Sequence, residues 1–306
     1  MKKLVICICT YNRNKSLKEC LKSIEKLNNS NKIKIIILIV DNTFDYQSFN
    51  LVKKIKKRFK YKIVQTNEKR RGVVYARNKA LNKLKYLNPW FVSFIDDDCT
   101  VNKFWLMNIL KKIKKNKADI LTGPQIYFEN KKSINYTKFF EKKYNSDTKR
   151  VKWAATNNVF FTYNTIKKKK LIFDKFLNKF GMGEDQLFFS ILNQRGCKIY
   201  WSKNIQVYEK EQKHRNNISW LITRSFRLGV LGHYIDTKLH GSFFGYVYNY
   251  LKAVLCLLYS TKFILKIYNK NSRILIISFF FRFVGKLIGP IIFNKINFLQ
   301  NNNKLN

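Results

Sequence analysis

The chain has 306 residues, enough for one large α/β domain or two small ones, and 46% of them are hydrophobic. This content excludes intrinsic disorder for most of the chain. Lysine and arginine total 61 against 18 acidic residues, which gives a formal net charge of +43 and predicts an anionic partner. Because Lys, Asn and Ile are abundant throughout, the charge does not choose among nucleic acid, an anionic membrane surface and a diphosphate-bearing small molecule.

The six cysteines form no C-x-x-C pair and have no histidine at metal-ligand spacing, so we expect a reduced, cytosolic compartment. The apolar run from Met1 to Cys9 is followed by polar residues before a signal-peptide core could form, and it predicts a first β-strand.

Short apolar runs rich in β-branched residues alternate with lysine-studded helical stretches as far as about residue 120. We expect strands near 4–9, 33–41, 61–65 and 90–96, and helices near 15–28, 47–58, 73–86 and 102–116. This alternation predicts an α/β fold with a mainly parallel sheet flanked by helices.

Beyond residue 118 the pattern loosens into a lysine-rich loop near 130–150 and a strand-like segment at 151–161. A glycine turn, a helix at about 184–194 and a strand ending at Trp201 follow. We expect residues 1–235 to form one domain.

Two stretches in the remaining tail, residues 236–306, are dense in Phe, Tyr, Leu and Ile. They span 243–267 and 273–293 and are interrupted by lysine and arginine, so their longest uncharged runs fall short of the roughly 20 residues of a spanning helix. We expect amphipathic helices that lie in the interface of an anionic membrane. The alternative is a helical pair packed on the α/β core.

Three adjacent carboxylates, Asp96, Asp97 and Asp98, follow the apolar strand WFVSFI. Their mutual repulsion at the end of a buried strand favours a neutralising divalent cation, and carboxylates suit Mg²⁺ or Mn²⁺. Ligands of open α/β folds bind at this end of the strands. The alternative is an N-terminal capping cluster before the helix expected over Val101–Asn116.

The first predicted strand ends in Thr10, Tyr11, Asn12 and Arg13, and the second ends in Asp41. If the strands are parallel, these residues share the sheet edge of the aspartate cluster and can form one wall of a nucleotide pocket. A carboxylate such as that of Asp41 can accept a hydrogen bond from a base or from a ribose hydroxyl.

The stretch from Arg70 to Asn78 places several cations, Arg77 among them, near Gly72 and a helix start. This arrangement is typical of an anion site, although a solvated basic helix end explains it equally well.

Gly181 and Gly183 precede Glu184 and Asp185, the two acids that open the helix expected near 184–194. The glycines leave room for a ligand to approach, and an ionised carboxylate at a helix N-terminus is a candidate general base. Helix capping alone explains the acids but not both glycines.

Taken together, these segments resemble the family 2 glycosyltransferases of the GT-A fold, near the bacterial exopolysaccharide enzymes. The resemblance covers residues 3–232. It rests on the order and spacing of CTYNR, IVDN, the G-x-x-x-A-R-N run, the aspartate triplet, GMGEDQLF, and VYE followed by RNNISWLITRSFRLG.

The resemblance implies an inverting transferase that uses a nucleotide-sugar donor, commonly a UDP-sugar. It implies that Asp41 contacts the base, that Asp96 or Asp97 contacts the ribose or the sugar, and that Asp98 binds the divalent metal. Thr10, Tyr11, Arg13 and Arg77 would complete the donor site.

In the same resemblance, Asp185 would deprotonate the acceptor hydroxyl and Glu184 would lie on the acceptor side. Many relatives carry a histidine near the position of Glu209 that supports the metal, whereas the exopolysaccharide subgroup tends to carry glutamate.

We expect a glycan or lipid-linked saccharide acceptor in surface polysaccharide synthesis, with the protein peripheral on the inner face of the cell membrane and no nucleic acid partner. One alternative is a nucleotidyltransferase, although TYNRN lacks the glycines of its phosphate loop. Others are a basic nucleic-acid-binding protein, whose charge would gather on one face, and an inactive membrane scaffold.

Overall fold

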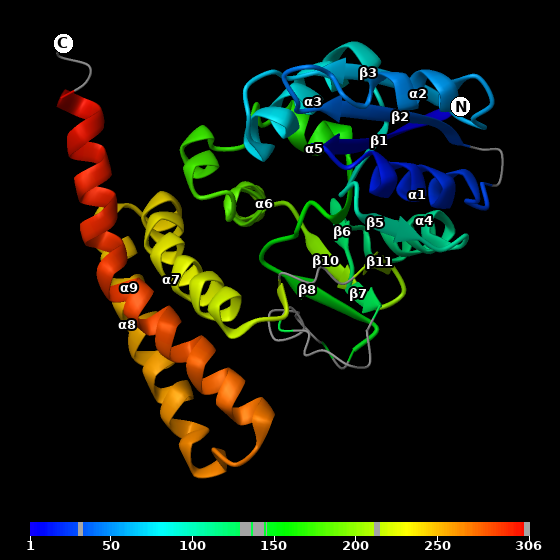
Figure 1. The fold of residues 1–306 in the computed structure, drawn as a ribbon. Helices are drawn as coiled ribbons and strands as arrows, with labels where there is room; N and C mark the ends of the chain where they lie inside the picture. Colours follow the sequence, from blue (N-terminus) through cyan, green and yellow to red (C-terminus); the bar gives the residue numbers. More distant parts are fainter. Residues whose placement is uncertain (30–32, 129–135, 137–143, 145, 211–214, 303–306) are drawn as a thin grey trace. The chain divides into compact units, whose positions relative to one another are not determined.

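The computed structural model describes residues 1–29, 33–128, 136, 144, 146–210 and 215–302 (Figure 1). The chain divides into two compact units, one of residues 1–128 and 141–210 and one of residues 129–140 and 211–306. The division therefore falls at residue 210, whereas the sequence predicts a boundary at 235. Most of the lysine-rich loop expected near 130–150 lies outside the described residues.

The first unit is built on an eight-stranded sheet in the order β3-β2-β1-β4-β9-β6-β10-β8. Four strands at one side are parallel to one another: β1 (Lys2–Thr10), β2 (Ile33–Asp41), β3 (Lys62–Asn67) and β4 (Phe91–Ile95). The others are β6 (Ile120–Thr122), β8 (Thr148–Val151), β9 (Asn158–Thr162) and β10 (Ile199–Ser202). β9 runs antiparallel to β4 and to β6, and β8 runs antiparallel to β10. The expected mainly parallel α/β sheet is confirmed.

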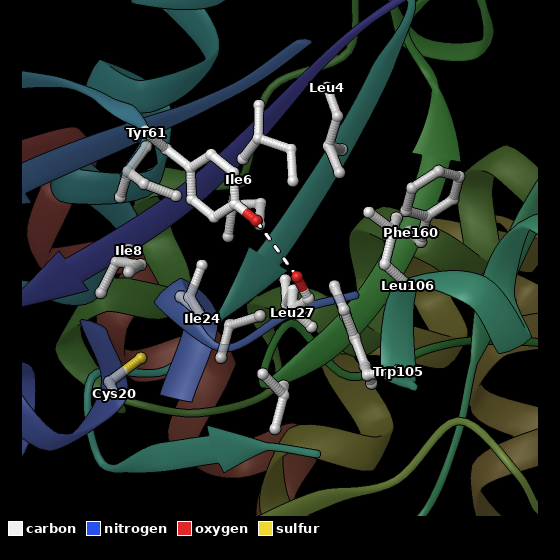
Figure 2. Close-up of a cluster of buried hydrophobic side chains, with 14 of the residues drawn as sticks. Leu4, Ile6, Ile8, Cys20, Ile24, Leu27, Tyr61, Trp105, Leu106 and Phe160 are labelled. Atoms are coloured by element: carbon white, nitrogen blue, oxygen red, sulfur yellow. Dashed lines mark hydrogen bonds between the residues drawn. The ribbon is translucent and has the colours of Figure 1, made fainter. Parts of the chain in front are cut away.

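Helices cover both faces of this sheet. Alternate residues of the central strands point to opposite sides, and both sets are apolar, so both faces must be buried. The helices are α1 (Asn14–Glu25), α2 (Phe49–Lys56), α3 (Val73–Leu87), α4 (Trp105–Asn116), α5 (Tyr163–Lys167) and α6 (Glu184–Gln194), with a short 3₁₀ helix, η2 (Lys175–Lys179). Leu4, Ile6 and Ile8 of β1 pack with α1 and α4 in one core cluster (Figure 2). The intervening Val5 and Cys7 pack with α3 and α6 in a second cluster.

A small second sheet of three strands follows the aspartate triplet. It consists of β5 (Cys99–Val101), β11 (Val207–Lys210) and β7 (Gln125–Phe128). The helix expected at 102–116 begins only at Trp105, and a strand separates it from Asp98. The capping interpretation of the triplet is therefore wrong, because a helix dipole acts only within the first turn.

The second unit contains α7 (Ile218–His240), α8 (Ser242–Lys262), a one-turn 3₁₀ helix, η4 (Ile264–Lys266), and α9 (Lys270–Asn302). The side chain of Asn217 caps α7 by accepting from the backbone N–H of Trp220 at 2.7 Å. The three long helices pack on one another. In the described residues one segment, Lys270–Lys295, is long and apolar enough to cross a membrane by length and composition. Arg282 and Lys286 interrupt it, so its uncharged runs are short, as the sequence predicts.

Candidate active site

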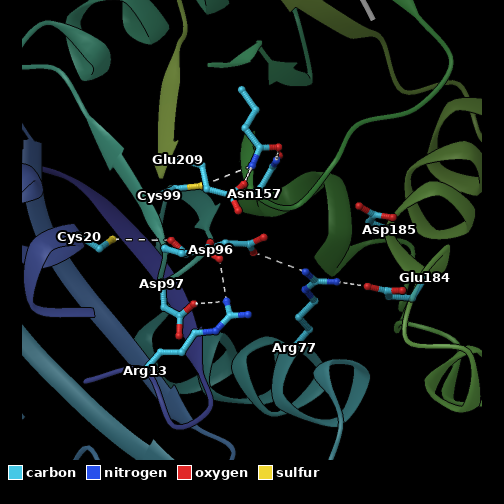
Figure 3. Close-up of polar contacts among 12 residues, drawn as sticks. Arg13, Cys20, Arg77, Asp96, Asp97, Cys99, Asn157, Glu184, Asp185 and Glu209 are labelled. Atoms are coloured by element: carbon cyan, nitrogen blue, oxygen red, sulfur yellow. Dashed lines mark hydrogen bonds and ion pairs between the residues drawn. The ribbon is translucent and has the colours of Figure 1, made fainter. Parts of the chain in front are cut away.

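The ends of the central strands bring the predicted donor-site residues to one edge of the large sheet. β1 pairs with β2 and β4 in parallel, and Thr10 lies opposite Asp41. The hydroxyl of Thr10 donates to Asp97 Oδ2 at 2.7 Å. Arg13 Nη1 contacts Asp97 Oδ1 at 3.2 Å and Asp98 Oδ2 at 2.7 Å (Figure 3). The strand-end cluster expected from the sequence therefore exists.

Arg77 of α3 joins this cluster to the start of α6. Its buried guanidinium forms an ion pair with Glu184 and lies 3.5 Å from Asp96 Oδ1 (Figure 3). Asp185 lies next to Glu184, close enough for Arg77 and Asp96 to influence its charge. Acidic side chains from two distant segments of the chain thus gather around one arginine.

The turn before α3 fixes the position of Arg77. Gly72 has a φ of 136°, and a Cβ at this position would lie 1.9 Å from Asn178 Oδ1 of η2. Six residues further on, Asn78 exchanges two hydrogen bonds of 2.9 Å with the backbone of Phe173. The glycine and the asparagine explain why this stretch holds α3 against the segment that leads to α6.

Asp185 stands in the first turn of α6, behind Gly183, which adopts a left-handed conformation with a φ of 89°. Its Oδ1 accepts from the backbone N–H of Gln186 at 2.7 Å. Burial and the adjacent Glu184 raise the pKa of Asp185 to about 6, against the opposing effect of Arg77. A carboxylate with this pKa is ionised at neutral pH and still basic enough to take up a proton.

Burial dominates the electrostatics of the aspartate cluster. It raises the pKa of Asp97 to about 6, although Arg13 and the hydroxyl of Thr10 act in the opposite direction. Burial also raises the pKa of Asp96. For Arg77, burial works to lower the pKa, but the charges of Glu184 and Asp96 outweigh it and raise the pKa. The site thus concentrates negative charge around Arg13 and Arg77, with Asp97 buried and Asp96 partly exposed.

A set of ligand-type side chains lies where the small sheet meets the aspartate cluster. Donor atoms of Asp98, Cys99 and Glu209 are within 4.8 Å of one another. Antiparallel pairing of β11 with β5 produces this set, since it places Glu209 opposite Cys99. The side-chain amide of Gln125 donates to Glu209, and that of Asn157 donates to Gln125 (Figure 3). The two carboxylates fit a hard divalent cation, while the buried thiol is the weakest ligand of the three.

The sequence indicates Asp98 as a metal ligand and leaves the role of Glu209 open, but it gives no signal for Gln125 and Asn157. Only the pairing of the strands reveals these two side chains, because they come from separate segments and match no short motif. The hydrogen-bonded amides orient the Glu209 carboxylate, as groups beside a metal ligand commonly do.

Asp41 holds the loop that follows β2. Its buried carboxylate accepts from the backbone N–H and the hydroxyl of Thr43, at 2.8 and 2.6 Å, and from the N–H of Ser48 at 2.7 Å. The neighbouring Asn42 accepts from the N–H of Gly72 at 2.8 Å. Asp41 therefore shapes the end of β2, and its contact with a base stays a prediction.

Tyr11 is exposed beside these residues. Its ring lies under the guanidinium of Arg71, with 5.3 Å between the guanidinium carbon and the ring centroid. An exposed aromatic ring at the end of β1 offers a flat surface on which a base can stack.

The model of the family described as "Glycosyl transferase family 2" matches residues 5–173, which is more than half of the chain. The protein therefore belongs to this family and is a glycosyltransferase, as the motifs predict.

Individual relatives agree with this membership. The chain is 26% identical over 242 residues to the succinoglycan biosynthesis protein ExoM of Rhizobium meliloti, a match that covers 76% of this chain and 75% of ExoM. Among solved structures, it is similar to S. aureus TarS 1–349, with a TM-score of 0.54 at 19% identity over 79% of this chain and 70% of that one. The complex of TarS with UDP-GlcNAc gives a TM-score of 0.54 at 20% identity over 79% of this chain and 71% of that one. The TarS structures establish the shared GT-A fold.

Proposed function

We propose that this glycosyltransferase moves a sugar, with inversion, from a nucleotide-sugar donor to a hydroxyl of a glycan or lipid-linked acceptor in surface polysaccharide synthesis. The observation that carries the proposal is the bridge from Asp96 through Arg77 to Glu184, because it joins the strand-end cluster to the segment that holds Asp185. The name of ExoM refers to succinoglycan biosynthesis, and TarS of the same fold binds UDP-GlcNAc, so we favour a UDP-sugar donor.

The donor lies, in this proposal, at the edge formed by β1, β2 and β4. Tyr11 stacks on the base, and Asp96 or Asp97 accepts hydrogen bonds from the ribose or the sugar. Arg13 and Thr10 hold the cluster in shape through their contacts with Asp97. Arg77 contributes a buried positive charge on the side of the diphosphate.

Transfer follows as a single displacement. The acceptor oxygen forms a bond to the anomeric carbon while the bond from that carbon to the diphosphate oxygen breaks, and the diphosphate leaves with the electron pair. Asp185 takes the proton of the attacking hydroxyl. Glu184 lies on the acceptor side, and its ion pair with Arg77 fixes the position of Arg77 beside Asp185.

Asp98 and Glu209 would hold Mn²⁺ or Mg²⁺. Their carboxylates approach each other beside β5, with Asp98 half-buried, Glu209 buried and Gln125 bonded to Glu209, and this donor set fits an ion that prefers oxygen ligands. Such an ion supplies Lewis-acid stabilisation of the charge on the leaving diphosphate.

The tail supports a location on the cytoplasmic side of the cell membrane, where a lipid-linked saccharide is within reach. A catalytic unit on the cytosolic side agrees with six cysteines that are all free thiols.

The test is a screen of the purified chain against nucleotide sugars with Mn²⁺, with release of nucleoside diphosphate as the readout. We expect one donor class to be turned over and Asp185→Asn to stop the reaction. Asp147→Asn, a change at an exposed aspartate away from the cluster, serves as the control. Equal turnover by native chain and Asp185→Asn would contradict the proposal.

A further inference from the structure

The second unit is built with its polar side inward. The buried residues of α8 are Gly245, Asn249, Ala253 and Ser260, all small or polar. Its large apolar residues face outward and include Phe243, Phe244, Val247, Leu251, Val254, Leu255 and Leu258. A helix of a water-soluble bundle shows the reverse pattern, with apolar residues buried and polar residues exposed.

α9 continues this pattern over much of its length. Ser272, Ser278 and Lys286 are buried, together with Ile274 and Phe293. Its exposed side carries Phe280, Leu287, Ile288 and Ile291. Most of the exposed large apolar side chains in the described part of the chain belong to α8, α9 and the turn between them.

Glycines let the helices approach backbone to backbone. A Cβ at Gly285 of α9 would lie 2.2 Å from the carbonyl oxygen of Phe226 in α7, and one at Gly229 would lie 2.3 Å from that of Arg282. At the other interface, a Cβ at Gly245 would lie 2.4 Å from Cα of Thr237. Small residues at the contact are typical of helices that associate within lipid, where apolar side chains gain nothing by packing inward.

Polar bonds cross the inside of the unit. Asn249 Nδ2 donates to the carbonyl oxygen of Lys286 at 2.8 Å, and the hydroxyls of Ser225 and Ser278 are 3.1 Å apart. Lys252 Nζ lies 2.5 Å from Oδ1 of the buried Asp236. These contacts pair several of the buried polar groups within the helical unit, an arrangement that a hydrocarbon environment favours.

We propose that the outward face of α8 and α9 is embedded in the hydrocarbon of a lipid bilayer. This face, called the apolar face below, comprises the exposed apolar residues of the two helices. In water these residues would be exposed apolar surface of the kind that marks a membrane or protein contact. Embedded in lipid, the same residues are solvated and the small and polar residues make the helix contacts.

The turn between the two helices defines which end lies near the headgroups. Lys262, Lys266, Lys270 and Arg273 are exposed there, and Tyr268 stands exposed among them. Cations and tyrosine rings favour the boundary between anionic headgroups and hydrocarbon. The turn therefore lies at the membrane surface, and attachment rests on apolar insertion with charge as a secondary contribution.

The proposal is tested by flotation of the purified full chain with vesicles, without any sugar donor, so that the result is separate from that of the proposed function. We expect binding to neutral phosphatidylcholine vesicles and retention after a wash in about 1 M NaCl, a concentration that screens surface charge. Binding to anionic vesicles alone, or release by the wash, would overturn the proposal.

A triple variant probes the apolar face directly. Leu251, Leu255 and Leu258 lie on one side of α8 and are each more than half exposed, so Leu→Gln at all three leaves the helix contacts intact. We expect the retained fraction to fall at least about tenfold. The matched control changes three exposed apolar residues of the first unit, Tyr86, Trp90 and Met107, to Gln and retains native binding.

Circular dichroism and thermal unfolding confirm that both triple variants fold. If the α8 variant floats like the native chain, the apolar face is not the membrane contact. If the native chain instead forms a lipid-free dimer that only the α8 variant abolishes, the face binds a second copy and the proposal fails.

Discussion

Arg77 and Glu184 form a buried ion pair although 107 residues separate them along the chain. The pair connects α3 to the first turn of α6, where Asp185 follows directly. Removing one partner of a buried ion pair leaves the other charge buried without compensation, so both partners are needed. Because Asp185 directly follows Glu184, the pair influences both the position and the pKa of the proposed base.

The first prediction concerns Glu184→Gln. Glu184 is one of the causes that raise the pKa of Asp185 to about 6, and Arg77 acts against it. The base must be ionised to accept a proton, so the rate rises with pH through this pKa. Removal of the Glu184 charge therefore moves the acid limb of the rate profile to lower pH, and Arg77→Met moves it to higher pH. Turnover measured from acid to neutral pH checks both directions.

The control for this pair is Glu68→Gln. Glu68 is also buried and ion-paired, with Arg70 Nε at 2.9 Å, but it does not influence Asp185. Its acid limb stays in place. Identical profiles for all three variants would show that the Arg77–Glu184 pair has only a structural role.

The second prediction is that Asp185→Asn lowers turnover about 10²–10⁴-fold, the usual contribution of a general base. Asparagine keeps the size of the side chain and can still accept from the N–H of Gln186. Donor binding, measured by calorimetry with UDP, stays within about twofold. A large loss of UDP binding would place Asp185 in the donor site instead.

The third prediction compares the contributions of Asp98, Cys99 and Glu209 to metal binding. Asp98→Asn and Glu209→Gln each remove a carboxylate and are expected to weaken Mn²⁺-dependent UDP binding about 10–100-fold. Cys99→Ser leaves it nearly unchanged, because an oxygen-preferring ion gains little from a thiol. Titration of UDP with and without Mn²⁺ measures the difference, and a loss confined to Cys99→Ser would contradict this ligand assignment.

The fourth prediction concerns stability against pH in a metal-free, chelator-treated sample. Burial raises the pKa of Asp97 from 3.8 to about 6, so the folded state holds a proton that the unfolded chain releases more easily. Stability contributed by the protonated acid is complete below about pH 4 and is lost as the pH rises to about 6. Asp97→Asn removes the part of this dependence that Asp97 contributes, leaves that of Asp96 and Asp185, and raises the melting temperature at neutral pH, while donor binding weakens. Thermal melts across the range test the sign.

The strands and helices of the first half follow from the sequence because each is a local pattern. β1 to β4 and the helices after them show apolar periodicity over several residues, and the predicted ranges agree with the structure to within a few residues. The sequence predicts the helix over Glu184–Gln194 equally well, because Gly183 precedes it and Gly196 follows it.

The features that the sequence does not predict depend on contacts between distant segments. β5 has only three residues, too few for a periodic signal, and it forms because β11 pairs with it. The proximity of Glu209 to Asp98 depends on that pairing. The ion pair of Arg77 with Glu184 likewise forms only when the folded sheet brings α3 and α6 together. The sequence therefore predicts both residues as candidates but not their contact.

The burial of the polar side of α8 is also not predictable from the sequence. The sequence shows where apolar and polar residues lie along the helix, but not which side the neighbouring helices cover. Gly245, Asn249 and Ser260 read as interruptions of an apolar stretch until α7 and α9 pack against them. Which face is buried is a tertiary property.

The last prediction tests the close packing of α7 on α9. A Cβ at Gly285 would meet the carbonyl oxygen of Phe226 at 2.2 Å, a backbone atom that cannot move aside without separating the helices. Gly232 is the matched control, since a Cβ there meets only the flexible end of Lys286, with Nζ at 2.5 Å. We expect Gly285→Ala to destabilise the helical unit by about 1–3 kcal/mol, the usual cost of overpacking, and Gly232→Ala to cost less. Unfolding in lipid or detergent, followed by circular dichroism, compares the two variants. Equal stability of both would show that α7 and α9 do not approach each other as closely as Gly285 and Phe226 imply.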